Sequence, residues 1–111
     1  MIRLGEAQVA DQALESIVRL AVESVPGARL DSPGRVSRVL PGRRGPVGWT
    51  LAGRVAAFDV DVVCEHGRVL PSLGEQVRRA VAEHVAGMTG LAVRTVDVTV
   101  TGLDRRQESA P

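Results

Sequence analysis

An alternation of valine with polar residues near the C-terminal end constrains the fold of this 111-residue chain most strongly. Two sets of side chains alternate over residues 92–101: Val96, Val98 and Val100 against Thr95, Asp97, Thr99 and Thr101. A period of two places each set on one face of a β-strand, and β-branched residues suit both faces. The pattern predicts a half-buried antiparallel strand in a sheet with one covered face.

Two amphipathic segments predict the helices that cover this sheet. Residues 9–25 repeat apolar side chains at steps of three and four until Pro26 and Gly27 end the pattern. Residues 71–86 repeat them again, with Pro71 in the first turn, where its missing N–H has no partner to lose. The stripe predicted to be buried on this second helix consists of Leu73, Val77, Ala80, Val81, Val85 and Met88. Gly87 and Gly90 are expected to close it.

Between the helices the pattern predicts a hairpin with its corner at residues 51–54. The second hairpin strand, 54–64, has one strongly apolar face, expected to meet the core: Ala56, Phe58, Val60, Val62 and Cys64. A short strand is predicted at 35–40. The opposite sheet face is expected to be wet and to carry Asp59, Asp61, Asp97, Thr99 and Thr101.

The order of elements predicts an α+β fold. We expect a two-layer sandwich in which two helices pack on one face of a small, three- to four-stranded, mainly antiparallel sheet. Residues 1–103 are expected to form a single domain, including an Arg/Gly/Pro-rich loop region at 29–48, and residues 104–111 a disordered polar tail. No apolar run reaches the roughly 20 residues that span a bilayer, and the N-terminus lacks a signal-peptide pattern. Direct membrane insertion is therefore not expected, and a cytoplasmic location is.

All 14 basic residues are arginines, yet the net charge is only +1. Five of them fall in a stretch without acids: Arg35, Arg38, Arg43, Arg44 and Arg54. Such a stretch could contact phosphate, lipid headgroups or an acidic partner, or it could be a solvated loop. Residues 42–45 match the letters of the GXXG loop of KH domains, but Pro41 and Pro46 bracket them and helices do not flank them.

No arrangement of residues predicts a catalytic, metal or cofactor site. Cys64 and His66 lie two apart on a predicted strand and so should point the same way, but a zinc site needs three or four ligands and the other histidine is His84. A buried cysteine and a corner histidine are the favoured interpretation. Asp59, Asp61 and Asp97 lie among threonines on the predicted open face, which indicates that the face is solvated. A cation-binding patch is the alternative. No small-molecule substrate is expected. Trp49, the sole tryptophan, is either a protein-interface anchor or a cap on the core.

The run from Phe58 to Leu103 resembles the bacterial alkaline shock, or envelope stress response, family. The residues that carry the resemblance are a valine-rich strand with its Gly67 corner, a helix begun by Pro71, the run from Met88 to Leu91, and a final strand closed by Gly102. His66 departs from the family pattern, which usually has an aromatic residue there. Residues 39–44 look like the actinobacterial branch of the family.

The resemblance implies a non-enzymatic cytoplasmic protein of the cell-envelope stress response. Its implied partner is a small membrane-anchored protein that holds it at the inner face of the membrane. The lack of a predicted catalytic set, and a predicted sheet whose open face and edges could add a strand from another chain, favour an interaction or scaffold module that binds copies of itself or paralogues. The residues themselves leave one alternative open, which is nucleic-acid binding through the arginine-rich stretch 35–54.

Overall fold

The computed structural model of the chain describes residues 2–4, 7–9, 11–31 and 45–104. Along these residues the elements are β1 (Ile2–Leu4), β2 (Ala7–Val9), α1 (Asp11–Glu23), β3 (Ala28–Leu30), β4 (Val47–Ala52), β5 (Val55–Glu65), α2 (Leu70–Thr89) and β6 (Ala92–Asp104). The strand predicted at 35–40 and residues 105–111 of the predicted tail lie outside the described residues. Asp104, predicted as the first residue of the disordered tail, is instead the last residue of β6. The β1–β2 hairpin and β3 were not predicted, and Val9 belongs to β2 rather than to the first helix.

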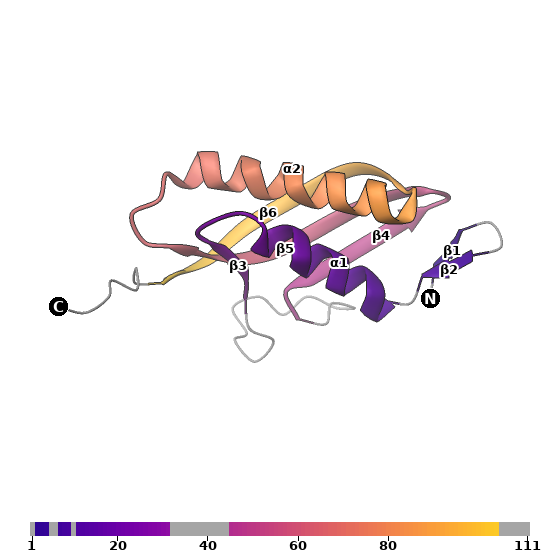
Figure 1. The fold of residues 1–111 in the computed structure, drawn as a ribbon, viewed down its shortest axis with the longest axis horizontal. Coiled ribbons are helices and arrows are strands. Elements are labelled where there is room, and N and C mark those ends of the chain that lie inside the picture. The colour runs from indigo at the N-terminus through magenta and orange to yellow at the C-terminus, as the bar shows by residue number, and fades with distance from the viewer. Residues whose placement is uncertain (1, 5–6, 10, 32–44, 105–111) are drawn as a thin grey trace.

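Strand β5 is the centre of the main sheet (Figure 1). Strand β6 pairs with it along its whole length, from Val55 to Glu65. The two antiparallel partners therefore share the opposite edge of β5, where β4 pairs with residues 55–60 and β3 with residues 62–64. The predicted α+β class is confirmed, β4 pairs antiparallel with β5 as the predicted hairpin requires, and β3 is antiparallel to β5 as well.

Strand β6 runs parallel to β5, so the antiparallel direction predicted for the last strand is wrong. The physical reason is the 20-residue helix α2 between the two strands. Such a helix carries the chain back to the end of the sheet where β5 began, and the next strand then runs in the same direction. Two register shifts interrupt the ladder, and they leave Arg94 and Thr101 as the extra residues of bulges in β6.

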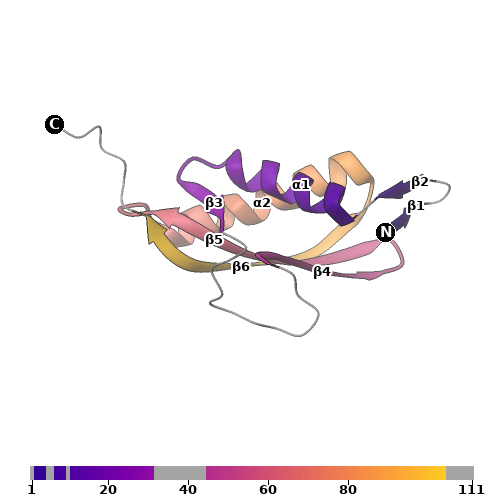
Figure 2. The ribbon, with the colours of Figure 1, turned by 90° about the horizontal axis from the view of Figure 1, so that it is seen from below.

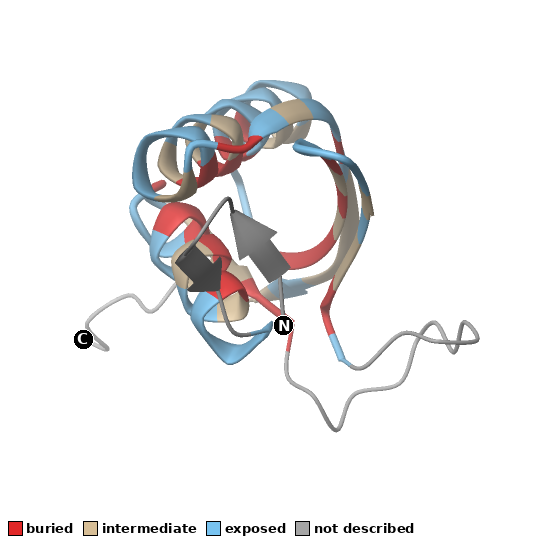
Figure 3. Cartoon of the chain, turned by 90° about the vertical axis from the view of Figure 1, so that its right-hand side faces the viewer, coloured by how far each residue is buried: buried red, intermediate tan, exposed pale blue. Residues whose placement is uncertain are grey.

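Both helices cover the same face of the main sheet, as predicted (Figure 2). Viewed along the layers, the buried residues line the space between the helices and the curved sheet (Figure 3). Helix α1 contributes four buried side chains at helical spacing: Leu14, Val18, Ala21 and Val22. Helix α2 contributes Leu73, Val77, Val81 and Val85, and β5 contributes the predicted apolar face.

Met88 is 59% exposed, although the apolar stripe predicted it to be buried. The buried residues of α2 follow steps of four from Leu73 to Val85, and the next step reaches Thr89. Met88 therefore lies beside the buried line rather than on it. Gly90 ends α2 in a left-handed conformation with φ of 75°, and its N–H donates to Ala86 O at 3.0 Å. Gly87 is inside the helix instead of closing it.

Candidate interaction surfaces

The sheet face turned away from the helices is called here the open face. Strand alternation and pairing place on it, among others, Arg29, Gly48, Thr50, Ala57, Asp59, Asp61, Val63, Thr95, Asp97, Thr99, Gly102 and Asp104. Thr95 and Asp97 are exposed, as a wet face requires. The prediction is wrong for Asp61, which is only 5% exposed. Asp31, just after β3, is buried to the same extent.

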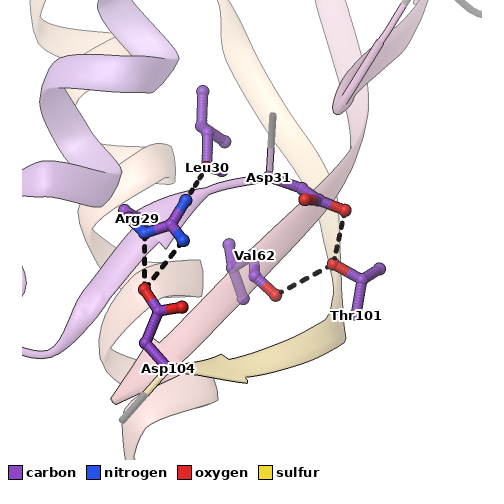
Figure 4. A network of polar contacts seen from close by, with 6 residues as sticks. All are labelled: Arg29, Leu30, Asp31, Val62, Thr101 and Asp104. Atoms are coloured by element: carbon purple, nitrogen blue, oxygen red, sulfur yellow. Dashed lines mark hydrogen bonds and ion pairs between the residues drawn. The ribbon is translucent and has the colours of Figure 1, made fainter. Parts of the chain in front are cut away.

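Side chains from opposite edges of the sheet meet across the open face (Figure 4). Arg29 Nε donates to Asp104 Oδ2 at 2.8 Å, and a second guanidinium nitrogen lies 2.7 Å from the same oxygen. Thr101 Oγ1 donates to Asp31 Oδ2 at 2.8 Å and lies 3.3 Å from Val62 O. We call Arg29, Asp31, Thr101 and Asp104 the polar clasp. It joins the segment around β3 to the end of β6 across the central strand.

The groups considered for chemistry do not converge. Cys64 is 1% exposed and faces the helices, and burial raises the pKa of its thiol. His66 lies beyond the end of β5, is exposed, and donates its backbone N–H to Asp104 O at 2.7 Å, so it is not on the strand from which its same-side placement with Cys64 was predicted. His84 Nδ1 lies 2.8 Å from Ala80 O within α2. Among the described residues, no group of three or more His, Cys, Asp or Glu could hold a metal ion.

Arg54 is the one arginine of the arginine-rich stretch that the described ranges include; Arg35, Arg38, Arg43 and Arg44 lie outside them. It is exposed at the β4–β5 turn, and its carbonyl accepts from Ala92 N at 2.9 Å. A Cβ on Gly90 would lie 3.3 Å from its guanidinium. The Arg54 charge is therefore near the C-terminal end of α2, where the helix dipole favours a cation.

Trp49 lies on the helix-facing side of β4 and is half-buried. It registers with Phe58 across the β4–β5 ladder, and the two ring centroids are 6.5 Å apart with a 46° tilt. This position fits a residue that caps the core. Its role as an interface anchor stays a prediction.

A family model described by a cell envelope-related function matches residues 2–105 of the chain. The chain belongs to this family, the alkaline shock protein 23 family. The resemblance carried by residues 58–103 is thereby confirmed.

Curated proteins similar to this family member are named "Stress response regulator gls24 homolog". Those of Streptococcus pyogenes serotypes M3, M28 and M1 are each 26% identical to it over 110 residues. The alignment covers 94% of this chain and 62% of each relative, so the chain spans less than two thirds of their length.

Solved structures similar to this alkaline shock protein 23 family member include variants of the MamM CTD. One variant has a TM-score of 0.50 at 16% identity, with 88% of this chain and 100% of that chain covered. A copper form of another variant has a TM-score of 0.50 at 15% identity, with the same shares covered. At these identities the similarity shows the fold alone. In the described ranges of this family member, no helix has the length and apolar character needed to cross a membrane.

The sequence of this family member predicts sheet edges that could add a strand from another chain, and among the described strands the outer edge of β6 is such an edge. Strand β6 has 13 residues and, within the described part of the chain, pairs with β5 alone. Val96 is its one buried residue, and Val98 and Val100 are half-buried although they pack against the core.

Proposed function

We propose that this member of the alkaline shock protein 23 family is a non-enzymatic interaction module of the cell-envelope stress response. The family description and the name of the curated relatives support the cellular role. The observation that carries the molecular role is the long outer edge of β6, which no other described strand pairs with, because a strand edge can bind a further strand by main-chain hydrogen bonds.

The chemistry of the described reactive groups supports a role without catalysis. A nucleophilic cysteine needs a lowered pKa and access to solvent, whereas Cys64 is buried and its pKa is raised. Two carboxylates of the open face, Asp31 and Asp104, are engaged by Thr101 and Arg29 in the polar clasp. These contacts favour a structural use of the acids.

The partners we propose are further copies of the chain, paralogues, or a small membrane-anchored protein that holds it at the cytoplasmic face of the membrane. Residues 1–103 would form the folded unit that binds them. The arginine-rich stretch, with Arg35, Arg38, Arg43, Arg44 and Arg54, would contact anionic groups of such a partner, and Trp49 would contribute apolar contact.

Deletion and fractionation in the bacterium that encodes the chain test this proposal. We expect deletion to sensitise cells to alkaline shock or to cell-wall antibiotics, and the wild-type gene to restore resistance. We expect the native chain in the membrane fraction, released by detergent but not by salt. An unchanged stress phenotype, together with retention of nucleic acid and no protein partner, would overturn the proposal.

A further inference from the structure

We infer that the outer edge of β6 pairs antiparallel with β6 of a second copy of the chain, about a two-fold axis at Val98. The inference deepens the proposed interaction function and rests on it, because it names the partner and the surface. Two copies joined in this way would form one continuous sheet with all helices on the same side.

The backbone groups of β6 that face outward follow from the contacts of β5. Asp61 directs both its N–H, to Pro46 O at 2.8 Å, and its C=O, to Asp31 N at 2.9 Å, toward the β3–β4 edge. Consecutive residues of a strand alternate sides, so Val60 directs its groups toward β6. In a parallel ladder it bonds to the residues on either side of its registered partner, Val98. Val98 therefore directs its own N–H and C=O outward, away from β5.

The same argument applied to Phe58, whose registered partner is Val96, gives Val96 an outward orientation as well. The segment 95–100 lies between the two bulges of β6 and is regular over its whole length. It contains no proline or lysine, the residues that commonly protect an edge. A neighbouring strand here would also cover the half-buried Val98 and Val100. The edge thus offers both hydrogen-bonding groups and apolar area to a partner.

The side chains select the register and the direction of this pairing. An axis at Asp97 would set this exposed acid against its own copy, which is unfavourable. An axis at Thr99 would set Asp97 against the bulged Thr101. The axis at Val98 sets Asp97 against Thr99 of the second copy and pairs Val96 with Val100.

Charge complementarity along the strand favours a second copy in the antiparallel direction. The exposed Arg94 lies near the start of β6, and Asp104, whose side chain is 45% exposed, ends it. Antiparallel pairing brings the basic end of one copy to the acidic end of the other, at the diagonal distance of about 7–8 Å that long side chains can bridge. Parallel pairing would place like charges together.

Sedimentation of the full chain with the variant Val98→Pro tests the edge. Proline lacks the N–H that points outward, and edge positions whose N–H does not serve the ladder tolerate it. We expect wild type to form dimers and Val98→Pro to raise the dissociation constant roughly tenfold or more, since both hydrogen bonds at the axis are lost. Val98→Ala is the matched control, because it shortens the side chain but keeps the backbone groups, and it should retain dimers. A monomeric wild type, or equal dissociation constants for the two variants, would overturn the inference.

A disulfide test keeps the inference falsifiable if Val98→Pro fails to fold. Asp97 and Thr99 would form a non-hydrogen-bonded pair across the interface, with Cα atoms about 4.5 Å apart, within disulfide range. Under oxidation, a mixture of Asp97→Cys and Thr99→Cys chains should give several-fold more covalent dimer than either variant alone. The native Cys64 is buried and does not compete. Equal yields from the mixture and the single variants would contradict the register.

The two proposals fail separately. A monomeric chain whose deletion still sensitises cells to envelope stress overturns the β6 pairing and leaves the proposed function intact. A dimer with the expected disulfide pattern supports the pairing even in a strain whose deletion has no envelope phenotype, and that strain would refute the envelope-stress role while leaving the interaction role.

Discussion

Arg29 and Asp104 join the two outer edges of the sheet across the central strand, with the guanidinium nitrogens 2.7 and 2.8 Å from one carboxylate oxygen. Arg29 of β3 pairs in register with Val63 of β5, and Val63 with Gly102 of β6. Gly102 has no side chain that could lie between Arg29 and Asp104. Val63 is 2% exposed although it lies on the open face. The pair thus covers an apolar residue as well as linking two strands.

Removing this pair should cost more than removing an ordinary surface ion pair. We expect Arg29→Ala to lower the free energy of unfolding by about 0.5–1 kcal/mol, since both side chains are more than 40% exposed and solvent weakens their attraction. Arg19→Ala, which removes the 3.6 Å pair with Glu15 on α1, is the control and should cost less than about 0.5 kcal/mol. Urea unfolding measures both. Equal losses would show that the clasp contributes nothing beyond a surface pair.

Thr101 is expected to matter through its hydroxyl. Thr101→Val keeps the shape of the side chain but removes the hydrogen bond to Asp31, a carboxylate that is 5% exposed. Because a buried acceptor then loses a partner, we expect a loss of about 1–3 kcal/mol in the free energy of unfolding. Thr101→Ser retains the donor and should recover most of this loss. If valine is tolerated as well as serine, the hydroxyl has no structural role.

The two glycines near the end of α2 should respond to alanine in opposite directions. Gly90 has φ of 75°, and a Cβ there would lie 3.3 Å from the Arg54 guanidinium, so Gly90→Ala should destabilise the fold by about 1–2 kcal/mol. Gly87 is within the helix, and nothing lies within 4 Å of a Cβ placed on it. Gly87→Ala should therefore stabilise by about 0.5–1 kcal/mol. Thermal unfolding measures both variants against wild type. Unfolding temperatures that change in the same direction in the two variants would contradict this prediction.

The buried thiol predicts a specific pH dependence. Burial raises the pKa of Cys64 above its ordinary value, so the folded chain retains this proton at pH values where the unfolded chain has lost it. The contribution of Cys64 to stability is then complete below the unfolded pKa of about 8.5 and is lost as the pH rises above it. Cys64→Ala should reduce the fall in stability on the alkaline side. Native chains should also react with iodoacetamide far more slowly than chains in urea, and equal rates would contradict the burial.

The periodicity of apolar residues predicted which side chains of a single helix or strand are buried. The apolar face of β5, from Ala56 to Cys64, is a local pattern that the structure confirms. The stripe predicted on α2 is confirmed at Leu73, Val77, Val81 and Val85 and is wrong at Met88. The direction of β6 is not local, since it depends on where α2 delivers the chain. Residues 28–30 are too short to show a period, so β3 could not be recognised from alternation.

The interaction surfaces were less accessible to sequence reasoning. Asp61 shares its strand face with the half-buried Asp59, yet it is buried, because exposure on that face depends on what crosses it from elsewhere in the chain. The clasp joins residues 75 positions apart, Arg29 and Asp104, and no spacing rule connects them. Arg54 was predicted as an anion contact from local charge, whereas its position beside Gly90 depends on the turn that brings β5 to the end of α2.

Because β5 lies at the centre and its parallel partner is the last described strand, synthesis leaves the sheet incomplete until residues 92–104 have emerged. A ribosome that has released only α1 through β5 presents a valine-rich strand with one side bare and no second helix above Phe58 and Val60. We therefore expect premature termination before Ala92 to yield an aggregation-prone fragment, which chaperones and proteases would have to remove, and not a shorter functional protein.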